Sequence, residues 1–308
     1  MSKRVVVLMG GFSVEREVSL VSGVAVAAAL EKAGYAVATI DVRRDLRTLI
    51  AGLDAAKPWA VFNALHGRFG EDGSIQGILD IMKIPYTHSG LLASALAMNK
   101  PMAKQTFAAA GIPVPEGRIV KKSEVLAGDV LARPYVLKPL NEGSSVGVHI
   151  VKQGDNGAPL AGEDWPFGDL VMAERFIPGR ELTVGVMGDK ALGVTEITSA
   201  RGFYDYTAKY APGESVHLVP APLPAEVTEE VKALAVKAHL ALGCRGVSRA
   251  DLRYDDTEAG KPGKLYLLEV NTQPGMTSTS LVPEQATHAG ISFVDLVTWM
   301  VEDARCDG

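Results

Sequence analysis

The chain has 308 residues, of which 47% are apolar and 22% are charged, and its net charge is −5. A single hydrophobic core stops growing at about 250–300 residues, so this length predicts two or three lobes. The negative balance, without a block of Lys or Arg, argues against a nucleic-acid partner. Two cysteines, Cys244 and Cys306, cannot make a disulfide framework, which fits a reducing cytosol.

The N-terminal residues predict a buried strand rather than a targeting or membrane segment. The apolar run 5–9 ends at Gly10 and Gly11, short of the roughly 7–15 apolar residues of a signal peptide. Residues 18–30 are apolar but interrupted by polar and small residues, and they fall short of the about 20 residues that span a bilayer. We therefore expect no transmembrane segment, no membrane partner and a cytoplasmic location.

The first third of the chain alternates predicted strands and helices. Strands are predicted over residues 5–8, 35–42 and 59–65, with a helix up to residue 34 and a short helix over residues 75–82. Ser13 and Ser74 suit the N-caps of the two helices. This alternation predicts a doubly wound sheet that binds ligands at the carboxyl ends of its strands.

Helices and short strands are predicted over the rest of the chain. Residues 89–110 are predicted to be mostly helical, short strands follow over residues 118–120, 135–138, 149–151 and 170–176, a hairpin over residues 181–197, and a helix over residues 225–242. Residues 198–222 show no clear period. A loop of that length inside a compact domain is usually functional or disordered.

Residues 136–147 indicate phosphate binding. A β-prone run carries Lys138 and then breaks into a loop of glycine and serine. Glycines let backbone N–H groups approach phosphate oxygens, serines add donors, and the lysine supplies a point charge. The segment by itself is only suggestive of a nucleotide site.

A predicted β-hairpin over residues 249–254 and 264–271 carries a second polar cluster. The period-2 rule places Arg249 and Asp251 on one face of the first strand and Glu269 and Asn271 on one face of the second. Two carboxylates and an amide oxygen suit Mg²⁺, which keeps water and bridges phosphates. The opposite face is expected to pack against the core through Leu252, Leu268 and Val270. The alternative is a surface hairpin with solvated charges.

Six segments together resemble ATP-grasp enzymes, and among them the D-alanine–D-alanine ligase family. They are residues 10–19 (GGFSVEREVS), 64–67 with 70–73 (ALHG, GEDG), 142–147 (EGSSVG), 203–210 (FYDYTAKY) and 268–277 (LEVNTQPGMT). The segments occur in the family's order and span nearly the whole chain. The resemblance implies an α/β fold with α+β elements in three lobes: a doubly wound substrate domain (1–96), a central ATP-grasp subdomain (97–178), and a C-terminal ATP-grasp subdomain with the metal site and a lid loop (179–308).

The resemblance also implies an activity. The expected reaction joins two D-alanines into D-alanyl-D-alanine through a D-alanyl phosphate, for peptidoglycan precursor synthesis. ATP and two Mg²⁺ ions, with Mn²⁺ as a substitute, are the expected cofactors, and a homodimer is the expected assembly. A D-alanine–D-lactate ligase or another ATP-grasp carboxylate–amine ligase is the nearest alternative.

The family pattern assigns roles to individual residues. The expected catalytic residues are Glu15, Ser144, Tyr210, Arg249 and Gly275. The expected ATP contacts are Lys100, Lys138, Glu174, Ile177, Glu181 and Lys209. The expected metal ligands are Asp251, Glu269 and Asn271. The expected substrate contacts are Glu15, His66, Ser280 and Leu281.

The sequence departs from the family pattern at two places, and three rival classes fit it less well. Arg175 and Phe176 stand where the family often has Lys-Trp, and Asn99 stands where Asp is common. A nicotinamide-dependent oxidoreductase needs Gly-x-Gly-x-x-Gly, but residue 12 is Phe, and a Walker-type Gly-Lys-Ser/Thr is absent from the sequence. A catalytically inactive ATP-binding regulator has no need of the oxyanion arginine, Arg249.

Overall fold

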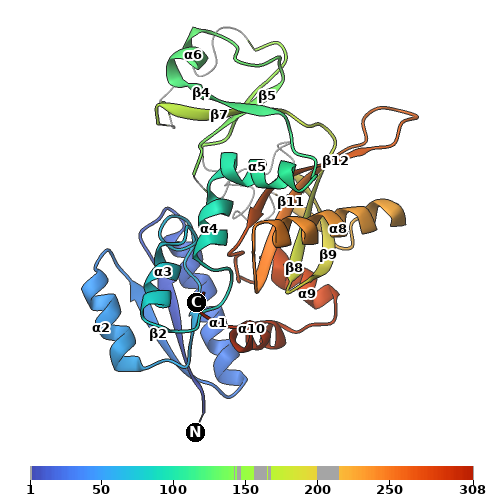
Figure 1. The fold of residues 1–308 in the computed structure, drawn as a ribbon. Coiled ribbons are helices and arrows are strands. Elements are labelled where there is room, and N and C mark those ends of the chain that lie inside the picture. Colours follow the sequence, from blue (N-terminus) through green and yellow to red (C-terminus); the bar gives the residue numbers. More distant parts are fainter. Residues whose placement is uncertain are drawn as a thin grey trace.

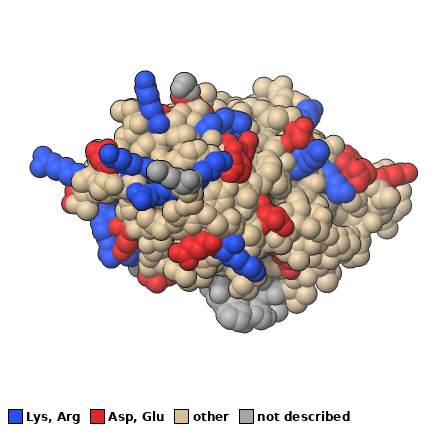
Figure 2. Space-filling model, turned by 90° about the horizontal axis from the view of Figure 1, so that it is seen from below, with Lys and Arg blue, Asp and Glu red and all other residues tan. Residues whose placement is uncertain are grey.

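In the computed structural model, the described residues form three β-sheets, one in each of three lobes (Figure 1). The structure describes residues 2–141, 143, 147–155, 165, 168–199 and 215–307. Among these residues no helix is both long and apolar enough to cross a membrane. On the face seen in Figure 2, acidic and basic side chains are interspersed.

The first lobe is built on a three-stranded parallel sheet of order β2-β1-β3. Its elements are β1 (Arg4–Gly10), α1 (Arg16–Lys32), β2 (Ala36–Val42), α2 (Leu46–Ala56), β3 (Ala60–Asn63) and α3 (Ser74–Ile81). Alternate residues of β1 face opposite sides: Val5 and Val7 pack with α1, whereas Val6 and Leu8 pack with α2 and α3. Helices therefore cover both faces, and the predicted doubly wound sheet is confirmed.

Local details of this lobe differ from the sequence-based expectations. Ser13 does not cap α1: its Oγ accepts from the backbone N–H of Glu15 (3.2 Å) and donates to the carbonyl of His66 (2.7 Å). Ser74 is the first residue of α3, and Gly73 precedes it with a φ of 94°. The helix α2 was not predicted, although Asp45 caps it by accepting from two backbone N–H groups.

The central lobe holds a four-stranded antiparallel sheet of order β4-β7-β5-β6. Its strands are β4 (Gly117–Lys121), β5 (Tyr135–Lys138), β6 (His149–Val151) and β7 (Leu170–Arg175), with α6 (Lys122–Ala127) after β4. Helices α4 (Leu91–Met98) and α5 (Lys100–Ala109) connect it to the first lobe (Figure 1). The two helices meet at Asn99, whose side chain caps α5 by accepting from Met102 N (3.1 Å). Asn and Asp cap helices equally well, which explains this departure from the family pattern.

The third lobe holds a five-stranded antiparallel sheet of order β10-β9-β8-β11-β12. Its elements are β8 (Arg180–Met187), β9 (Lys190–Ser199), β10 (Ser215–Leu218), α8 (Ala225–Ala241), β11 (Val247–Asp255), β12 (Lys264–Asn271), α9 (Leu281–His288) and α10 (Phe293–Glu302). The expected hairpins β8–β9 and β11–β12 are both present. The helices α9 and α10 were not predicted.

A β-bulge in the β11–β12 hairpin changes which leucine reaches the core. Asp251 pairs with Glu269, but the next residue, Leu252, pairs with Leu267, so Leu268 has no partner in the ladder. Leu267 is consequently fully buried and Leu268 only partly. The expectation for Leu268 was wrong, because one extra residue reverses the alternation of the strand.

The last helix, α10, lies against the first lobe rather than against the third-lobe sheet. Its buried residues Leu296, Val297, Met300 and Val301 belong to the same core cluster as Val5 and Phe62. Figure 1 shows α10 beside α1. The lobe limits at residues 96 and 178 remain predictions, and the chain end contributes to the core of the lobe in which the chain begins.

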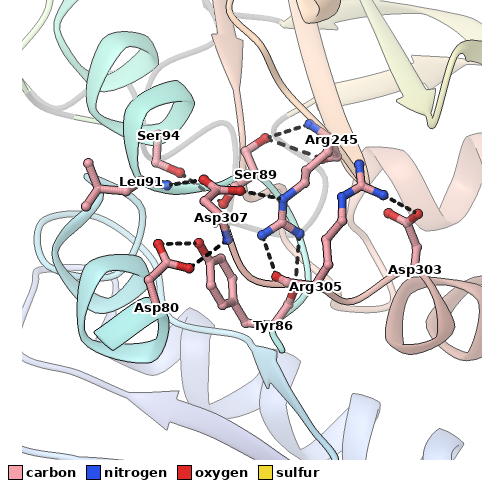
Figure 3. A network of polar contacts seen from close by, with 9 residues as sticks. All are labelled: Asp80, Tyr86, Ser89, Leu91, Ser94, Arg245, Asp303, Arg305 and Asp307. Atoms are coloured by element: carbon pink, nitrogen blue, oxygen red, sulfur yellow. Dashed lines mark hydrogen bonds and ion pairs between the residues drawn. The ribbon is translucent and has the colours of Figure 1, made fainter. Parts of the chain in front are cut away.

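A buried arginine ties the chain end to two lobes (Figure 3). Arg245 donates to the carbonyls of Tyr86 (3.1 Å) and Arg305 (2.7 Å) and to the carboxylate of Asp307 (3.3 Å). Asp307 in turn accepts from the backbone N–H of Leu91 (3.1 Å), at the start of α4. Because Arg245 immediately precedes the Gly246–β11 segment, this Arg245 clamp fixes the start of β11 relative to the first lobe.

The buried His239 in α8 makes stability depend on pH. Its Nδ1 lies 2.6 Å from Ser248 Oγ, and burial lowers its pKa to about 4. An unfolded His has a pKa of about 6.5, so the unfolded chain binds the proton first, and stability present above pH 6.5 is lost as the pH falls toward 4. In urea unfolding, His239→Gln is expected to reduce the loss of unfolding free energy between pH 7 and 5 by about 2 kcal/mol.

The exposed His288 provides the matched control for this measurement. His288→Gln is expected to keep the parent pH dependence. Equal pH dependence in His239→Gln and the parent chain contradicts the assignment.

Candidate functional site

A cavity lies where residues of all three lobes meet, and it contains seven of the residues that the sequence singles out: Glu15, His66, Lys100, Arg249, Glu269, Asn271 and Gly275. We call it the substrate cavity. Its first-lobe wall comes from the segments that follow β1 and β3. These segments lie at the carboxyl ends of parallel strands, where α/β sheets bind ligands.

The first-lobe wall presents one acid and one histidine. Glu15 is 5% exposed and occupies the N-cap position of α1, where the helix dipole favours a carboxylate. His66 is 6% exposed, and its Nε2 lies 3.5 Å from Ser22 Oγ. Burial lowers the pKa of His66, although the charge of Glu15 acts in the opposite direction. His66 therefore faces the cavity as a neutral imidazole at neutral pH.

A second acid, Glu71, lines the same cavity and was not assigned a role from the sequence. Burial, reinforced by the charge of Glu15, raises the pKa of Glu71 well above its ordinary value. A Cβ placed on Gly143 lies 3.0 Å from Glu71 Oε1 and 3.5 Å from Glu15 Oε2. Glycine at 143 therefore lets the backbone at this residue approach both acids. The sequence feature that could have identified Glu71 is its place in the GEDG segment, residues 70–73, which carries part of the family resemblance.

The opposite wall is the end of the β11–β12 hairpin, where Asp251 pairs with Glu269 and Arg249 with Asn271. Arg249 binds Asp251 through Nε (2.8 Å) and Nη2 (2.7 Å), and Lys100 Nζ lies 3.6 Å from Glu269. Like charges directly opposite in a ladder repel. Two cations next to the carboxylate pair therefore balance it.

The donor set of this wall fits a divalent cation that prefers oxygen. Asp251 and Glu269 supply carboxylate oxygens, and Asn271 supplies an amide oxygen that accepts from Gln273 N (2.7 Å). Among the described residues no group of three or more His, Cys, Asp or Glu side chains is arranged to hold a metal. Mg²⁺ keeps several waters and uses one or two carboxylates together with phosphates, so two carboxylates and an amide match its needs.

The loop after β12 holds the remaining predicted substrate contacts. Gly275 lines the cavity, and a Cβ there lies 2.8 Å from Ser280 Oγ, so only glycine fits without displacing that hydroxyl. Ser280 accepts from Thr277 N (2.9 Å) and precedes α9. Leu281 is 6% exposed and packs against Ile197. Ser280 lies next to Gly275, which lines the substrate cavity, but neither Ser280 nor Leu281 is among the lining residues.

A buried charge cluster occupies the central lobe. Glu174 lies between Lys138 and Lys104 and forms an ion pair with each, and all three side chains are at most 9% exposed. Burial raises the pKa of Glu174, but the charges of Lys138 and Lys104 outweigh it and hold the pKa below its ordinary value. Lys104 also donates to the carbonyl of Pro115. No sequence pattern singles out Lys104, because its partner lies 70 residues away.

Arg253 organises the segment after Glu174. Its Nε donates to the carbonyl of Ile177 (3.1 Å), and its Nη1 lies 3.3 Å from Glu181. The Phe176 ring lies 5.9 Å from the Arg253 guanidinium, and Arg175 lies 5.2 Å from the Tyr266 ring. Cation–π contacts thus hold the two residues that depart from the family pattern. Arg253 was not singled out from the sequence.

Three predicted site residues, Ser144, Lys209 and Tyr210, lie outside the described residues, as does most of the predicted lid loop. Their roles remain predictions.

The chain matches family models and related proteins that are all D-alanine–D-alanine ligases, and the relatives cover its whole length. The family model for the D-ala D-ala ligase C-terminus matches residues 106–302, and the model for the N-terminus of the same ligase matches residues 48–89. A D-alanine–D-alanine ligase from Rhodospirillum rubrum is 64% identical over 307 residues, covering 100% of both chains. One from Paramagnetospirillum magneticum is 63% identical over 308 residues, also covering 100% of both chains.

Solved structures show the same relationship. The crystal structure of D-alanine–D-alanine ligase from Bacillus anthracis complexed with ATP has a TM-score of 0.80 at 32% identity, covering 98% of this chain and 97% of that one. The expected α/β ATP-grasp fold is thereby confirmed. This chain belongs to the D-alanine–D-alanine ligase family.

Proposed function

We propose that the protein is an ATP-dependent ligase that joins two D-alanines into D-alanyl-D-alanine for peptidoglycan precursor synthesis. The observation that carries this proposal is the substrate cavity itself. One wall offers a carboxylate, Glu15, and the other offers a guanidinium, Arg249, beside a carboxylate pair. An amino acid presents an ammonium and a carboxylate, which these walls complement.

The proposed reaction has two steps. The carboxylate of the first D-alanine attacks the γ-phosphorus of ATP, and ADP leaves as an acylphosphate forms. The amine of the second D-alanine then attacks the acyl carbon, loses a proton, and expels inorganic phosphate. No protein nucleophile is needed, so catalysis rests on positioning and on stabilisation of charge.

The cavity residues have matching roles in this reaction. Glu15 binds the ammonium of the first D-alanine in a chain with Ser144 and Tyr210. Arg249 and the backbone N–H of Gly275 stabilise the oxyanion of the tetrahedral intermediate. The Asp251 carboxylate holds the guanidinium by two hydrogen bonds (2.8 and 2.7 Å), which fixes its direction before substrate arrives.

ATP is proposed to bind between the central and third lobes. Lys100, Lys138 and Lys209 contact the phosphates, Glu174 and Ile177 the adenine edge, and Glu181 the ribose. Asp251, Glu269 and Asn271 are proposed to hold two Mg²⁺ ions, or Mn²⁺ in their place. When bound, these ions neutralise charge that develops on the transferred phosphoryl group.

Further parts of the proposal rest on the family. The lobes span residues 1–96, 97–178 and 179–308, the loop 200–215 closes over the site, and Ser280 and Leu281 meet the second substrate's carboxylate. The protein is proposed to be a cytoplasmic homodimer. Sedimentation of the purified chain tests the dimer.

Lys104→Met is expected to raise the KM for ATP about tenfold while the KM for D-alanine changes little. Without Lys104, the buried carboxylate of Glu174 keeps Lys138 as its one ion-pair partner among the described residues, and the Lys138 ammonium is then less available to phosphate. Steady-state kinetics with each substrate varied in turn measures the difference.

Lys152→Met removes an exposed lysine of the same lobe and is the control. Removing one partner of a buried ion pair destabilises by about 3–5 kcal/mol, so thermal unfolding accompanies the kinetics. Equal increases in both KM values indicate a purely structural role for Lys104 and contradict the prediction.

Phosphate release from ATP tests the proposed function directly. D-alanine, L-alanine and D-lactate are offered alone and in pairs. Release that requires only D-alanine supports the ligase, and release that requires D-lactate supports the D-alanine–D-lactate alternative.

A further inference from the structure

A second cavity lies in the first lobe, across the loop that carries His66 from the substrate cavity. Its volume is about 280 Å³, near the lower end of the roughly 300–1,000 Å³ of ligand pockets. Apolar side chains from α2, α3 and the segment after β3 form its floor: Leu49, Leu65, Ile75 and Ile78. Apart from His66, no residue that lines this first-lobe cavity is a predicted residue of the ligase site.

Two arginines stand at the cavity, Arg44 and Arg68, and neither has a carboxylate partner among the residues that the structure describes. The Arg44 guanidinium lies 4.9 Å from the Phe12 ring and 5.9 Å from the Phe69 ring, and Arg68 lies 5.8 Å from the Phe69 ring. The two rings are 4.8 Å apart. Among the described residues neither arginine forms an ion pair.

The other charged residues of the lining are already engaged. Arg43 binds Asp41 (2.6 Å), and the Asp45 carboxylate is turned toward α2, where it accepts from Thr48 Oγ1 (2.6 Å) and from backbone N–H groups. Within the described part of the chain, the unpaired charge at the cavity is therefore positive, carried by Arg44 and Arg68.

We propose that the first-lobe cavity binds a small amphipathic carboxylate, with its apolar or aromatic body on the floor and its carboxylate on Arg44 and Arg68. A guanidinium matches a carboxylate with two parallel hydrogen bonds. A polar anion alone leaves the apolar floor uncovered, and a neutral apolar molecule leaves both arginines unpaired. A ligand with both properties satisfies the whole lining.

The ligand is coupled to catalysis through a shared wall, and this part rests on the proposed function. His66 lines both cavities. Its loop is anchored where Ser13 Oγ donates to the His66 carbonyl (2.7 Å) and Asn63 Nδ2 donates to the Gly70 carbonyl (2.9 Å). A ligand that contacts Leu65 and His66 in the first-lobe cavity changes the position of His66, which also forms part of the wall that faces the first D-alanine.

Calorimetric titration of the full chain with 4-phenylbutyrate and with its neutral amide tests the binding. The carboxylate is expected to bind about tenfold more tightly than the amide. In the double variant Arg44→Met, Arg68→Met the difference is expected to disappear. The control is Arg47→Met, which changes a neighbouring exposed arginine outside the lining. In this variant the difference in affinity between the carboxylate and the amide is expected to remain.

A second variant keeps the fold and closes the cavity. Leu46 is 52% exposed at the start of α2, so Leu46→Trp places an indole at the mouth without disturbing the core, and it is expected to abolish binding of both probes. Absence of binding by the parent chain, or unchanged affinities in the arginine and Leu46→Trp variants, overturns the proposal.

Kinetics test the coupling separately. Saturating 4-phenylbutyrate is expected to change the KM for D-alanine by about fivefold or more in the parent chain and not in Leu46→Trp. An unchanged KM overturns the coupling. Calorimetry needs neither ATP nor turnover, so failure of the ligase assay leaves the binding test intact.

Discussion

Glu269→Gln is expected to lower turnover about 10³-fold, which corresponds to about 4 kcal/mol of transition-state stabilisation. The substitution keeps the size of the side chain and removes its charge. Glu269 is the cross-strand neighbour of Asp251, and together they are the only two carboxylates proposed to hold the metal ions. An amide binds Mg²⁺ less well than a carboxylate, so charge on the transferred phosphoryl group is left unbalanced.

A measurement of the melting temperature distinguishes the loss of a metal ligand in Glu269→Gln from misfolding. Asp251 and Glu269 repel each other across the ladder, and Glu269→Gln removes that repulsion while it also weakens the Lys100 ion pair (3.6 Å). The melting temperature is therefore expected to change little as activity collapses. Glu258→Gln, at an exposed ion pair with Lys261, is the control. Turnover near the parent value at saturating Mg²⁺ contradicts the metal assignment.

Local patterns predicted the parts of the site that lie within one element. The period-2 rule placed Arg249 and Asp251 on one face, and the structure shows them bonded to each other. The same rule failed at Leu268, because the bulge adds one residue without any signal in the sequence. The register of a hairpin depends on how its two strands pair, and the pattern of one strand carries no information about that pairing.

Non-local contacts account for most of what the sequence did not reveal. Lys104 lies one helical turn after Lys100, yet its significance comes from Glu174 on a distant strand. The α10 helix completes the first lobe although the chain leaves that lobe about two hundred residues earlier. No periodicity indicates which sheet an amphipathic helix will cover.

The Arg245 clamp suggests how the two walls of the substrate cavity keep their distance. Glu15 and His66 belong to the first lobe, whereas Arg249 belongs to β11, four residues after Arg245. The clamp bonds Arg245 to the first-lobe carbonyl of Tyr86 (3.1 Å) and to the chain end. A short segment of β11 thus links an interlobe anchor to the proposed oxyanion residue.

Arg249→Lys is expected to lower kcat about 10²–10³-fold, the usual cost of losing one oxyanion donor, with a smaller effect on the KM for ATP. Lysine keeps the charge but loses the planar fork that now binds Asp251 by two hydrogen bonds (2.8 and 2.7 Å). Its ammonium is held in no fixed direction. It therefore stabilises the tetrahedral oxyanion less well.

The chain offers a matched control in Arg180, which binds Glu196 through the same two-bond geometry (2.9 and 2.6 Å) away from the substrate cavity. Arg180→Lys loses an equivalent fork and is expected to cost stability without a comparable loss of kcat. If both variants lose kcat equally, the arginine fork matters for folding rather than for the oxyanion. If only Arg249→Lys loses kcat, the charge of Arg249 alone is insufficient and its fixed direction is what the reaction requires.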